Sequence, residues 1–510
     1  MRRLIPVAAI AALISTGCSV NPVTGENQLI LVSEGQEVQM GIQAYDPTKQ
    51  SQGGEYDVDP ALTEYVQNVG NRLAAVSDRE LPYEFAVLNN STPNAWALPG
   101  GKIAINRGLL TELDSEAELA AVLGHEIVHA AARHSAQAMS RGLLSQVLVV
   151  ATAIATSDSD YGNLAVGGAN VGAAVLNATY GRGAELESDL YGMRYMSEAG
   201  YDPQGAVTLQ ETFVRLSENR RTDWLSGLFA SHPPSQARVE ANRDTAAKLR
   251  DGGKIGKDDY AKAMRRTMQL KPAYDAYDEG RKALAEGNVD QAVALSEKAL
   301  DLFNGEAHFH ALRGDIRLMQ KNYDWAITNY TRAIERRDDF FYYHLQRGLA
   351  KKEQKNLDGA RADLDRSVEL MPTAPGYYAL GQIAEQRGDI DTAIQHYSVV
   401  AQGGGDYGKA AAGDLARLDM PRNPGNYIAR RCSADASGNL VVSVQNQANV
   451  TVAGVRIAIQ YTDNAGRLQQ QVQSIAGQIP PGRVASLNTG LGPYTGGSCP
   501  TEVVGAQVVQ

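Results

Sequence analysis

The sequence of 510 residues has no cluster of basic residues, and its net charge is −10. A chain of this charge has no general attraction to a phosphate backbone, so nucleic acid is not expected as a partner. The two apolar runs at 4–14 and 143–155 are both shorter than the roughly 18 residues that a membrane-spanning helix needs. Neither run is therefore expected to cross a bilayer.

Cysteine is scarce, with 3 in the whole chain. Residues 1–18 combine a basic start, an apolar run and small residues before Cys18, which predicts a signal peptide. The ending Ser-Thr-Gly-Cys resembles a bacterial lipobox, although Ser15 stands where Leu is usual, and ordinary signal peptidase cleavage is the alternative. Lipidation at Cys18, followed by Ser19 rather than Asp, would anchor the protein to the outer membrane, facing the periplasm. In that oxidising compartment Cys432 and Cys499 are expected to form a disulfide, with two buried free thiols as the alternative.

Histidine is also scarce, with 8 residues, so a chance His-Glu-x-x-His is expected on the order of once in a hundred such sequences. The chain nevertheless contains His125-Glu126-x-x-His129. The stretch 115–141 opens with a Ser-x-x-Glu capping signal and contains no Pro, which predicts a continuous helix. Residues four apart share a helix face, so both imidazoles point at one spot, with Glu126 beside it. This pattern is typical of a zinc hydrolase with a glutamate general base.

Catalytic zinc usually has a third protein ligand. The next acidic helical segment carries Glu185 and Asp189 four residues apart. Glu185 is placed to reach the metal, while Asp189 is placed to hold a ligand imidazole by its second ring nitrogen. Glu187 is expected to point elsewhere. A solvated acidic face is the alternative.

These motifs join further short ones: Glu185-x-x-x-Asp189 with Gly192, Asn94-Ala95-x-Ala97-Leu98-Pro99-Gly100-Gly101, and Gly200-Tyr201-Asp202-Pro203. Together they resemble the gluzincin metallopeptidases of the HtpX and CAAX prenyl endopeptidase family, in particular its BepA-like periplasmic branch. The resemblance spans about residues 20–250. It implies one Zn²⁺ per chain, held by His125, His129 and Glu185, with Glu126 as general base and Asp189 as partner of a ligand imidazole.

The triplet Ser231-His232-Pro233 also resembles that branch, in which the matching histidine lies close to the metal. The resemblance implies that His232 caps or gates the site. A loop histidine unrelated to the site is the alternative.

Helical repeats follow the peptidase region. Glycines recur at 33 or 34 residues, each followed by an alanine twelve residues later: Gly280, Gly314, Gly348 and Gly381, with Ala292, Ala326, Ala360 and Ala393. The period resembles the tetratricopeptide repeat (TPR), an α-solenoid that recruits clients or assembly partners. After residue 426 the apolar period becomes two, which predicts a small β-sandwich, similar to the FxLYD family of immunoglobulin-like domains.

The predicted chain is therefore multidomain. Its parts are a signal peptide (1–18), a mainly α metallopeptidase domain with a small β-hairpin or sheet (19–250), a TPR domain (272–415) and a β-sandwich (424–510). The sequence leaves the roles of two segments undecided. The strand within 94–110 is either a sheet edge that pairs with an extended peptide or a plain hairpin. The run 143–155 is a core helix, a lid or a surface that dips into a membrane.

Three functions are consistent with these features. The first is an exported zinc endopeptidase in envelope quality control. The second is a periplasmic adaptor or chaperone whose zinc site is silent or capped. The third is a zinc hydrolase that acts on something other than peptide. The intact set His125, Glu126, His129 and Glu185 favours the endopeptidase.

The lipobox yields the first testable prediction. Replacement of Cys18 by Ser should move the protein from the membrane fraction to the soluble periplasm, because several acyl chains anchor firmly and a chain without them does not. Fractionation followed by immunoblotting measures this. A wild-type protein already in the soluble fraction would contradict the lipobox.

Overall fold

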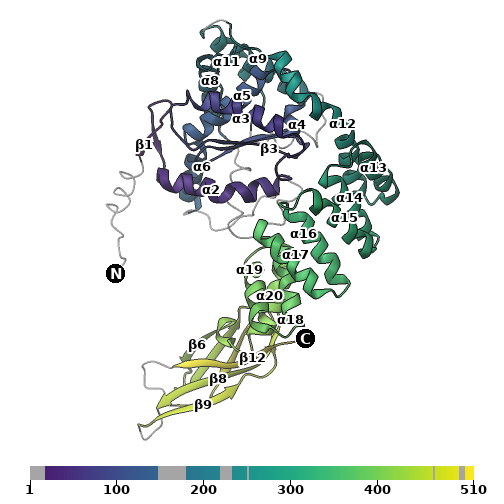
Figure 1. Ribbon diagram of the computed structural model, residues 1–510. Coiled ribbons are helices and arrows are strands. Elements are labelled where there is room, and N and C mark those ends of the chain that lie inside the picture. The colour runs from purple at the N-terminus through teal and green to yellow at the C-terminus, as the bar shows by residue number, and fades with distance from the viewer. Residues whose placement is uncertain are drawn as a thin grey trace. The chain divides into compact units, whose positions relative to one another are not determined.

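The computed structural model describes residues 18–146, 180–218, 232–249, 252–462, 466–492 and 500–509 (Figure 1). The chain divides into two compact units. One comprises residues 1–350 with 369–371, and the other comprises 351–368 with 372–510. The His-Glu-x-x-His motif lies in the first unit, and the C-terminal strands lie in the second.

The first unit contains a three-stranded sheet in the order β3 (Glu84–Leu88), β5 (Lys102–Asn106) and β4 (Ala95–Leu98). β5 runs parallel to β3 and antiparallel to β4. In the turn between β4 and β5, Gly100 and Gly101 have φ of 79° and 85°, a region that glycine adopts without steric cost. β4 and β5 form the hairpin that both predicted alternatives contain, and β4 lies at an edge of this sheet among the described strands. Pairing of that edge with a peptide stays a prediction.

Helices cover both faces of this sheet (Figure 1). Odd-numbered strand residues such as Phe85 and Ile103 pack with α3 (Pro60–Ala74) and α5 (Glu116–Ala131). Even-numbered residues such as Trp96 pack with α2 (Glu34–Ser51). The period-two alternation of the strands thus buries both faces, and it places the motif helix α5 directly on the sheet.

α5 begins after Ser115, whose Oγ accepts a hydrogen bond from the Glu118 backbone N–H at 3.2 Å. The Glu118 carboxylate accepts from the Asp114 N–H instead of that of Ser115, so the predicted reciprocal capping box forms only in half.

The predicted continuous helix is also wrong at its other end. α5 ends at Ala131, Arg133 has φ 63°, and α6 (His134–Gln146) begins at the next residue. A buried ion pair explains this left-handed backbone, because Arg133 Nε donates to Oε2 of Glu37 at 2.7 Å.

Three further described helices of the peptidase region are α8 (Arg182–Glu198), α9 (Gln204–Glu218) and α11 (Gln236–Ala246). α8 and α9 pack on α5, and α11 packs on both of them. The contact between α8 and α5 is close at Gly192, where a Cβ would lie 3.0 Å from the backbone nitrogen of His125. Glycine at this position lets the carboxylates of α8 approach the histidines of α5.

The predicted repeats are confirmed as a series of helices: α12 (Lys257–Ala285), α13 (Val289–Leu302), α14 (Ala307–Met319), α15 (Tyr323–Arg336), α16 (Phe341–Glu353), α17 (Leu357–Leu370), α18 (Ala374–Gln386), α19 (Ile390–Ala401) and α20 (Gly405–Asp419). Their periodic glycines are contact points. A Cβ on Gly314 would lie 2.6 Å from the ring of Tyr330, and one on Gly381 would lie 2.6 Å from the ring of Tyr397. In the first unit, Met264, Tyr274 and Phe309 share one apolar core with the peptidase region.

Two antiparallel C-terminal sheets share one cluster of buried apolar residues. One sheet contains β6 (Ile428–Ala434), β7 (Leu440–Asn446) and β11 (Val484–Asn488). The other contains β8 (Val452–Thr462), β9 (Leu468–Ser474), β10 (Gln478–Ile479) and β12 (Thr501–Val508). Cys432 lies on β6, whereas Cys499 lies outside the described residues, so their pairing stays a prediction.

Two other predictions also fall outside the described residues. These are the signal peptide up to residue 17 and the part of the apolar run at 147–155. Among the helices that are described, none has the length and apolarity needed to cross a membrane.

Candidate metal centre

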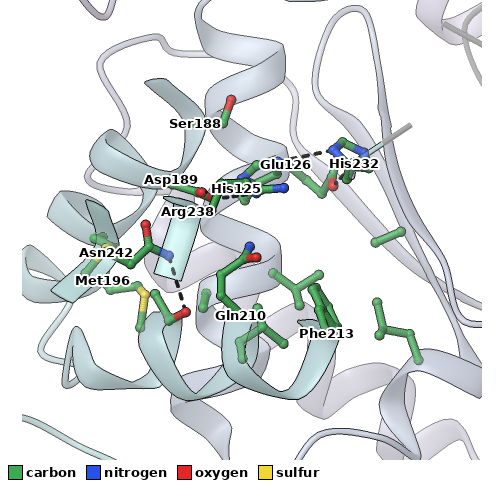
Figure 2. Close-up of a pocket in the computed structure, with 17 residues that line it drawn as sticks. His125, Glu126, Ser188, Asp189, Met196, Gln210, Phe213, His232, Arg238 and Asn242 are labelled. Atoms are coloured by element: carbon green, nitrogen blue, oxygen red, sulfur yellow. Dashed lines mark hydrogen bonds and ion pairs between the residues drawn. The ribbon is translucent and has the colours of Figure 1, made fainter. Parts of the chain in front are cut away.

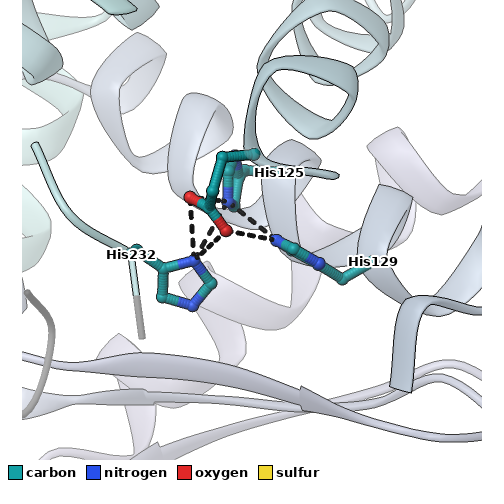
Figure 3. A group of neighbouring side chains, drawn as sticks. His125, His129 and His232 are labelled. Carbon is teal, nitrogen blue, oxygen red and sulfur yellow. Dashed lines mark hydrogen bonds and ion pairs between the residues drawn. The ribbon is translucent and has the colours of Figure 1, made fainter. Parts of the chain in front are cut away.

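Donor atoms of four buried residues, His125, His129, Glu185 and His232, converge on one point (Figure 3). The Nε2 atoms of the two α5 histidines lie 3.0 Å apart, and Oε1 of Glu185 lies 3.4 Å from Nε2 of His129. Nδ1 of His232 lies 3.3 Å from Nε2 of His125 and 3.0 Å from Oε1 of Glu185. The structure thus brings the three predicted ligands together and adds His232 to them.

The donor spacing fits a metal ion. Four atoms arranged tetrahedrally at about 2.0–2.1 Å from a zinc ion lie roughly 3.3–3.4 Å from one another. Of the six pairs that the four donor atoms make, these four lie 3.0–3.4 Å apart, and all six lie within 4.8 Å. Three imidazoles and one carboxylate form a nitrogen and oxygen donor set that suits a divalent transition metal.

The structure places Asp189, the predicted partner of a ligand imidazole, in contact with His125. Nδ1 of His125 lies 2.9 Å from Oδ1 of Asp189, so the ring donates its proton there and presents the Nε2 lone pair to the cluster. Arg238 on α11 donates to both oxygens of Asp189 at 2.7 Å, and its Nη1 lies 2.9 Å from Oε2 of Glu185. Burial acts to raise the pKa of Asp189, but Arg238 and His125 outweigh it and hold that pKa below its ordinary value. Asp189 therefore remains a carboxylate.

Burial keeps the imidazole of His129 neutral. His129 is 1% exposed, and this burial moves its pKa well below the ordinary value. A neutral imidazole is the form that binds a metal.

Glu126 lies beside the donor cluster without being one of its members. Its Oε2 is buried and has no hydrogen-bond partner among the described residues, while its Oε1 lies 3.6 Å from Nε2 of His232. Burial raises the pKa of the Glu126 carboxyl. A buried carboxylate oxygen of this kind is placed to receive a proton from a water molecule.

Glu126 and His125 line a cavity of about 30 Å³ (Figure 2). Apolar side chains such as Phe213 of α9 make up much of its wall. A space of this size holds roughly two water molecules. Ala95 of β4 lines the same cavity, so the sheet edge lies at the site.

Comparison with known proteins places the donor cluster within a peptidase domain. Residues 60–246 match the model of Peptidase family M48, and residues 277–340 and 345–407 match a tetratricopeptide repeat. The chain carries an M48 domain followed by TPR repeats. The M48 match includes both motif histidines, Glu126, Glu185 and His232.

Several relatives carry names that fit this domain. The beta-barrel assembly-enhancing protease of Escherichia coli K12 is 27% identical over 56% of this chain and 58% of its own length. The protein of the same name from Yersinia pestis is 29% identical over 42% of this chain and 44% of its own. The metalloprotease LoiP of Escherichia coli K12 is 28% identical over 48% of this chain and 96% of its own. The chain thus spans about half the length of the assembly-enhancing proteases that it matches.

Sequence reasoning missed two residues of the M48 site. Arg238 lies 49 positions after Asp189, and no local pattern marks it as a partner of that carboxylate. His134 contacts His129 and lies only five residues after it in the sequence. In the predicted unbroken helix this spacing turns the two side chains to different faces, so His134 was given no role.

Replacement of Arg238 by Met should weaken Zn²⁺ binding by about 10- to 100-fold, the usual effect of losing an outer-shell partner. The physical reason is that Asp189 and Glu185 would both lose their buried cation. Arg243→Met is the matched control, because Arg243 lies on the same helix and pairs with Glu211 in solvent. Competition with a chromophoric chelator measures the affinity. Equal affinities in the two variants would show that Arg238 does not support the ligands.

Proposed function

We propose that this protein is an exported, zinc-dependent endopeptidase that acts in envelope protein quality control. The observation that carries the proposal is a convergent donor set beside Glu126, whose buried Oε2 has no hydrogen-bond partner among the described residues. A purely structural metal site would have no use for that carboxylate, because burying it without a partner is costly.

The residues have distinct roles in this proposal. His125, His129 and Glu185 would hold the zinc, which would act as a Lewis acid and lower the pKa of the attacking water. Glu126 takes a proton from that water and passes it to the leaving amine. Asp189 holds His125 in the ligand tautomer. In this proposal an extended peptide would pair with β4, which lies at an edge of the sheet and whose Ala95 lines the cavity, and this favours a peptide substrate over other classes.

The cellular role rests on the relatives. Two of them are named for enhancing beta-barrel assembly, and both resemble this chain over about half of their length. The TPR helices would recruit clients or assembly partners, and the first of them share an apolar core with the peptidase region. We place the protein in the periplasm, anchored to the outer membrane through Cys18. We also assign the C-terminal strands to a β-sandwich that a Cys432–Cys499 disulfide closes.

The position of His232 favours a second function. Its Nδ1 approaches His125 and Glu185, and its Nε2 faces Glu126. An imidazole in this position occupies the fourth ligand site, where the attacking water would bind. In this state the protein is latent and acts as a TPR-based adaptor or chaperone. Client binding on the repeats would favour the open form by shifting a two-state balance.

Glu126→Gln should abolish casein hydrolysis while zinc content stays at the wild-type level. An amide does not accept the proton of the water, and the loss should be at least about 10²-fold, the usual scale for a general base. Glu211→Gln on α9 is the control, since this exposed carboxylate lies outside the cavity lining. Casein cleavage and bound zinc are measured on the same samples. Full activity of the Glu126→Gln protein would remove the general-base assignment.

His232→Ala should raise basal casein hydrolysis severalfold, with self-cleavage, while zinc remains bound through its other three ligands. Removing the ring frees the position that the water needs. Hydrolysis rate and zinc content are again compared with wild type. Lower activity with zinc retained would mean that His232 assists the reaction, and an unchanged rate would mean that it neither caps nor assists.

A further inference from the structure

The outer nitrogen of His129 contacts a second imidazole. Nδ1 of His129 lies 3.0 Å from Nδ1 of His134, and the ring centroids are 4.9 Å apart. His134 is 4% exposed and is the first residue of α6. The two ligand histidines of α5 are therefore supported differently, since His125 contacts a carboxylate directly.

The proton positions on this pair follow from the role of His129. For Nε2 of His129 to offer a lone pair to the cluster, the proton of the ring must sit on Nδ1. That N–H then donates to Nδ1 of His134, and this nitrogen must be unprotonated in order to accept the bond. The proton of His134 consequently sits on Nε2, and this atom lies 3.4 Å from Oε1 of Glu187.

Glu187 is the end of this chain of contacts. Its carboxylate accepts a hydrogen bond from Nδ2 of Asn21 at 2.8 Å. A carboxylate oxygen of Glu187 faces Nε2 of His134 and offers it an acceptor, which leaves Nδ1 of His134 to accept from His129.

The segment that carries Asn21 is itself fixed to the end of α5. β1 (Cys18–Val20) pairs with β2 (Asn27–Leu29), and Nε2 of Gln28 donates to the backbone oxygen of Ala132. Arg133 donates to Oγ of Ser19 at 3.1 Å. The left-handed backbone of Arg133 then starts α6 at His134, next to His129. The amino-terminal hairpin and the broken helix thus place the ends of this contact chain.

We propose that Asn21, Glu187 and His134 are positioning residues that hold His129 in the tautomer and orientation that metal binding requires. This inference rests on the proposed metal site. In this proposal the segment that follows Cys18 supports the metal site. Cys18, the proposed lipidation site, lies three residues before Asn21, which contacts Glu187. Both ligand histidines then end on carboxylates of α8, His125 on Asp189 and His129 on Glu187 through His134.

The test measures metal binding rather than hydrolysis, on the purified full chain. Glu187→Ala should weaken Zn²⁺ binding by about 10- to 100-fold, the range found when outer-shell partners of metal ligands are removed. Glu187→Gln should recover most of the affinity, because its amide oxygen still accepts from Nε2 of His134. Asn21→Ala should cause a smaller, severalfold loss, since it leaves the carboxylate in place.

Glu198→Ala is the matched control. Glu198 lies on the same helix as Glu187, is exposed and pairs only loosely with Arg194, at 3.7 Å. The absorption spectrum of the Co²⁺-loaded protein provides a second readout, because its visible bands follow ligand geometry. These bands should shift in Glu187→Ala and remain unchanged in Glu198→Ala. The unfolding temperature of the metal-free proteins reports any general loss of stability.

The outcomes separate cleanly. Weaker binding and a shifted Co²⁺ spectrum in Glu187→Ala, with recovery in Glu187→Gln, support the positioning role. Unchanged affinity and spectrum in Glu187→Ala overturn it, even if the metal-free protein is less stable. Equal losses in Glu187→Ala and Glu187→Gln also overturn it, because an acceptor would then not suffice. A wild-type chain that binds no Zn²⁺ would instead defeat the proposed metal function.

Discussion

The close contact between α5 and α8 is the constraint on which the rest of the site depends. A Cβ on Gly192 would lie 3.0 Å from the His125 nitrogen, and one on Gly124 would lie 3.1 Å from the Gly192 oxygen. Two glycines facing each other let the helix backbones approach more closely than ordinary side chains allow. The carboxylates of α8 can then reach the imidazoles of α5. With a wider spacing, Glu185 would miss the donor cluster.

Charge balance explains why this arrangement calls for a cation. Three buried carboxylates, Glu126, Glu185 and Asp189, face one guanidinium, that of Arg238. Fully ionised, these groups carry a net charge of −2, and burying uncompensated charge costs several kcal/mol. Protonation relieves part of that cost, which is the direction in which burial moves the pKa of Glu126. A divalent ion held by the donor cluster would balance this charge. It would also favour the ionised form of Glu126, the form that the proposed general base needs.

The features that the sequence predicted correctly are those that depend on residues close together in the chain. The four-residue spacing of His125 and His129 needs only a helix to bring the two rings together, and the TPR period needs only one repeat to pack on the next. The turn at Gly100 is equally local. Such features depend on few residues, so composition and spacing suffice to predict them.

The errors and omissions have long-range causes. α5 ends at Ala131 and the backbone turns left-handed at Arg133, although no Gly or Pro stands there, because Glu37 binds the Arg133 guanidinium from 96 residues away. Arg238 supports Asp189 from another helix. In each case tertiary packing determines which carboxylate the arginine contacts, and this cannot be predicted from local patterns in a single sequence. The role of His134 depends on the same break, so it was hidden by the same cause.

The position of His232 limits how the proposed cap can move. Arg238 donates to the backbone oxygen of Pro233 at 3.3 Å and also to Asp189, which orients His125. A movement that carried Pro233 away would cost this hydrogen bond. An opening that keeps the bond leaves Pro233 in place and swings the imidazole about the torsions of His232. The gate would thus be one residue long, and the cap could leave without loosening the ligands that remain.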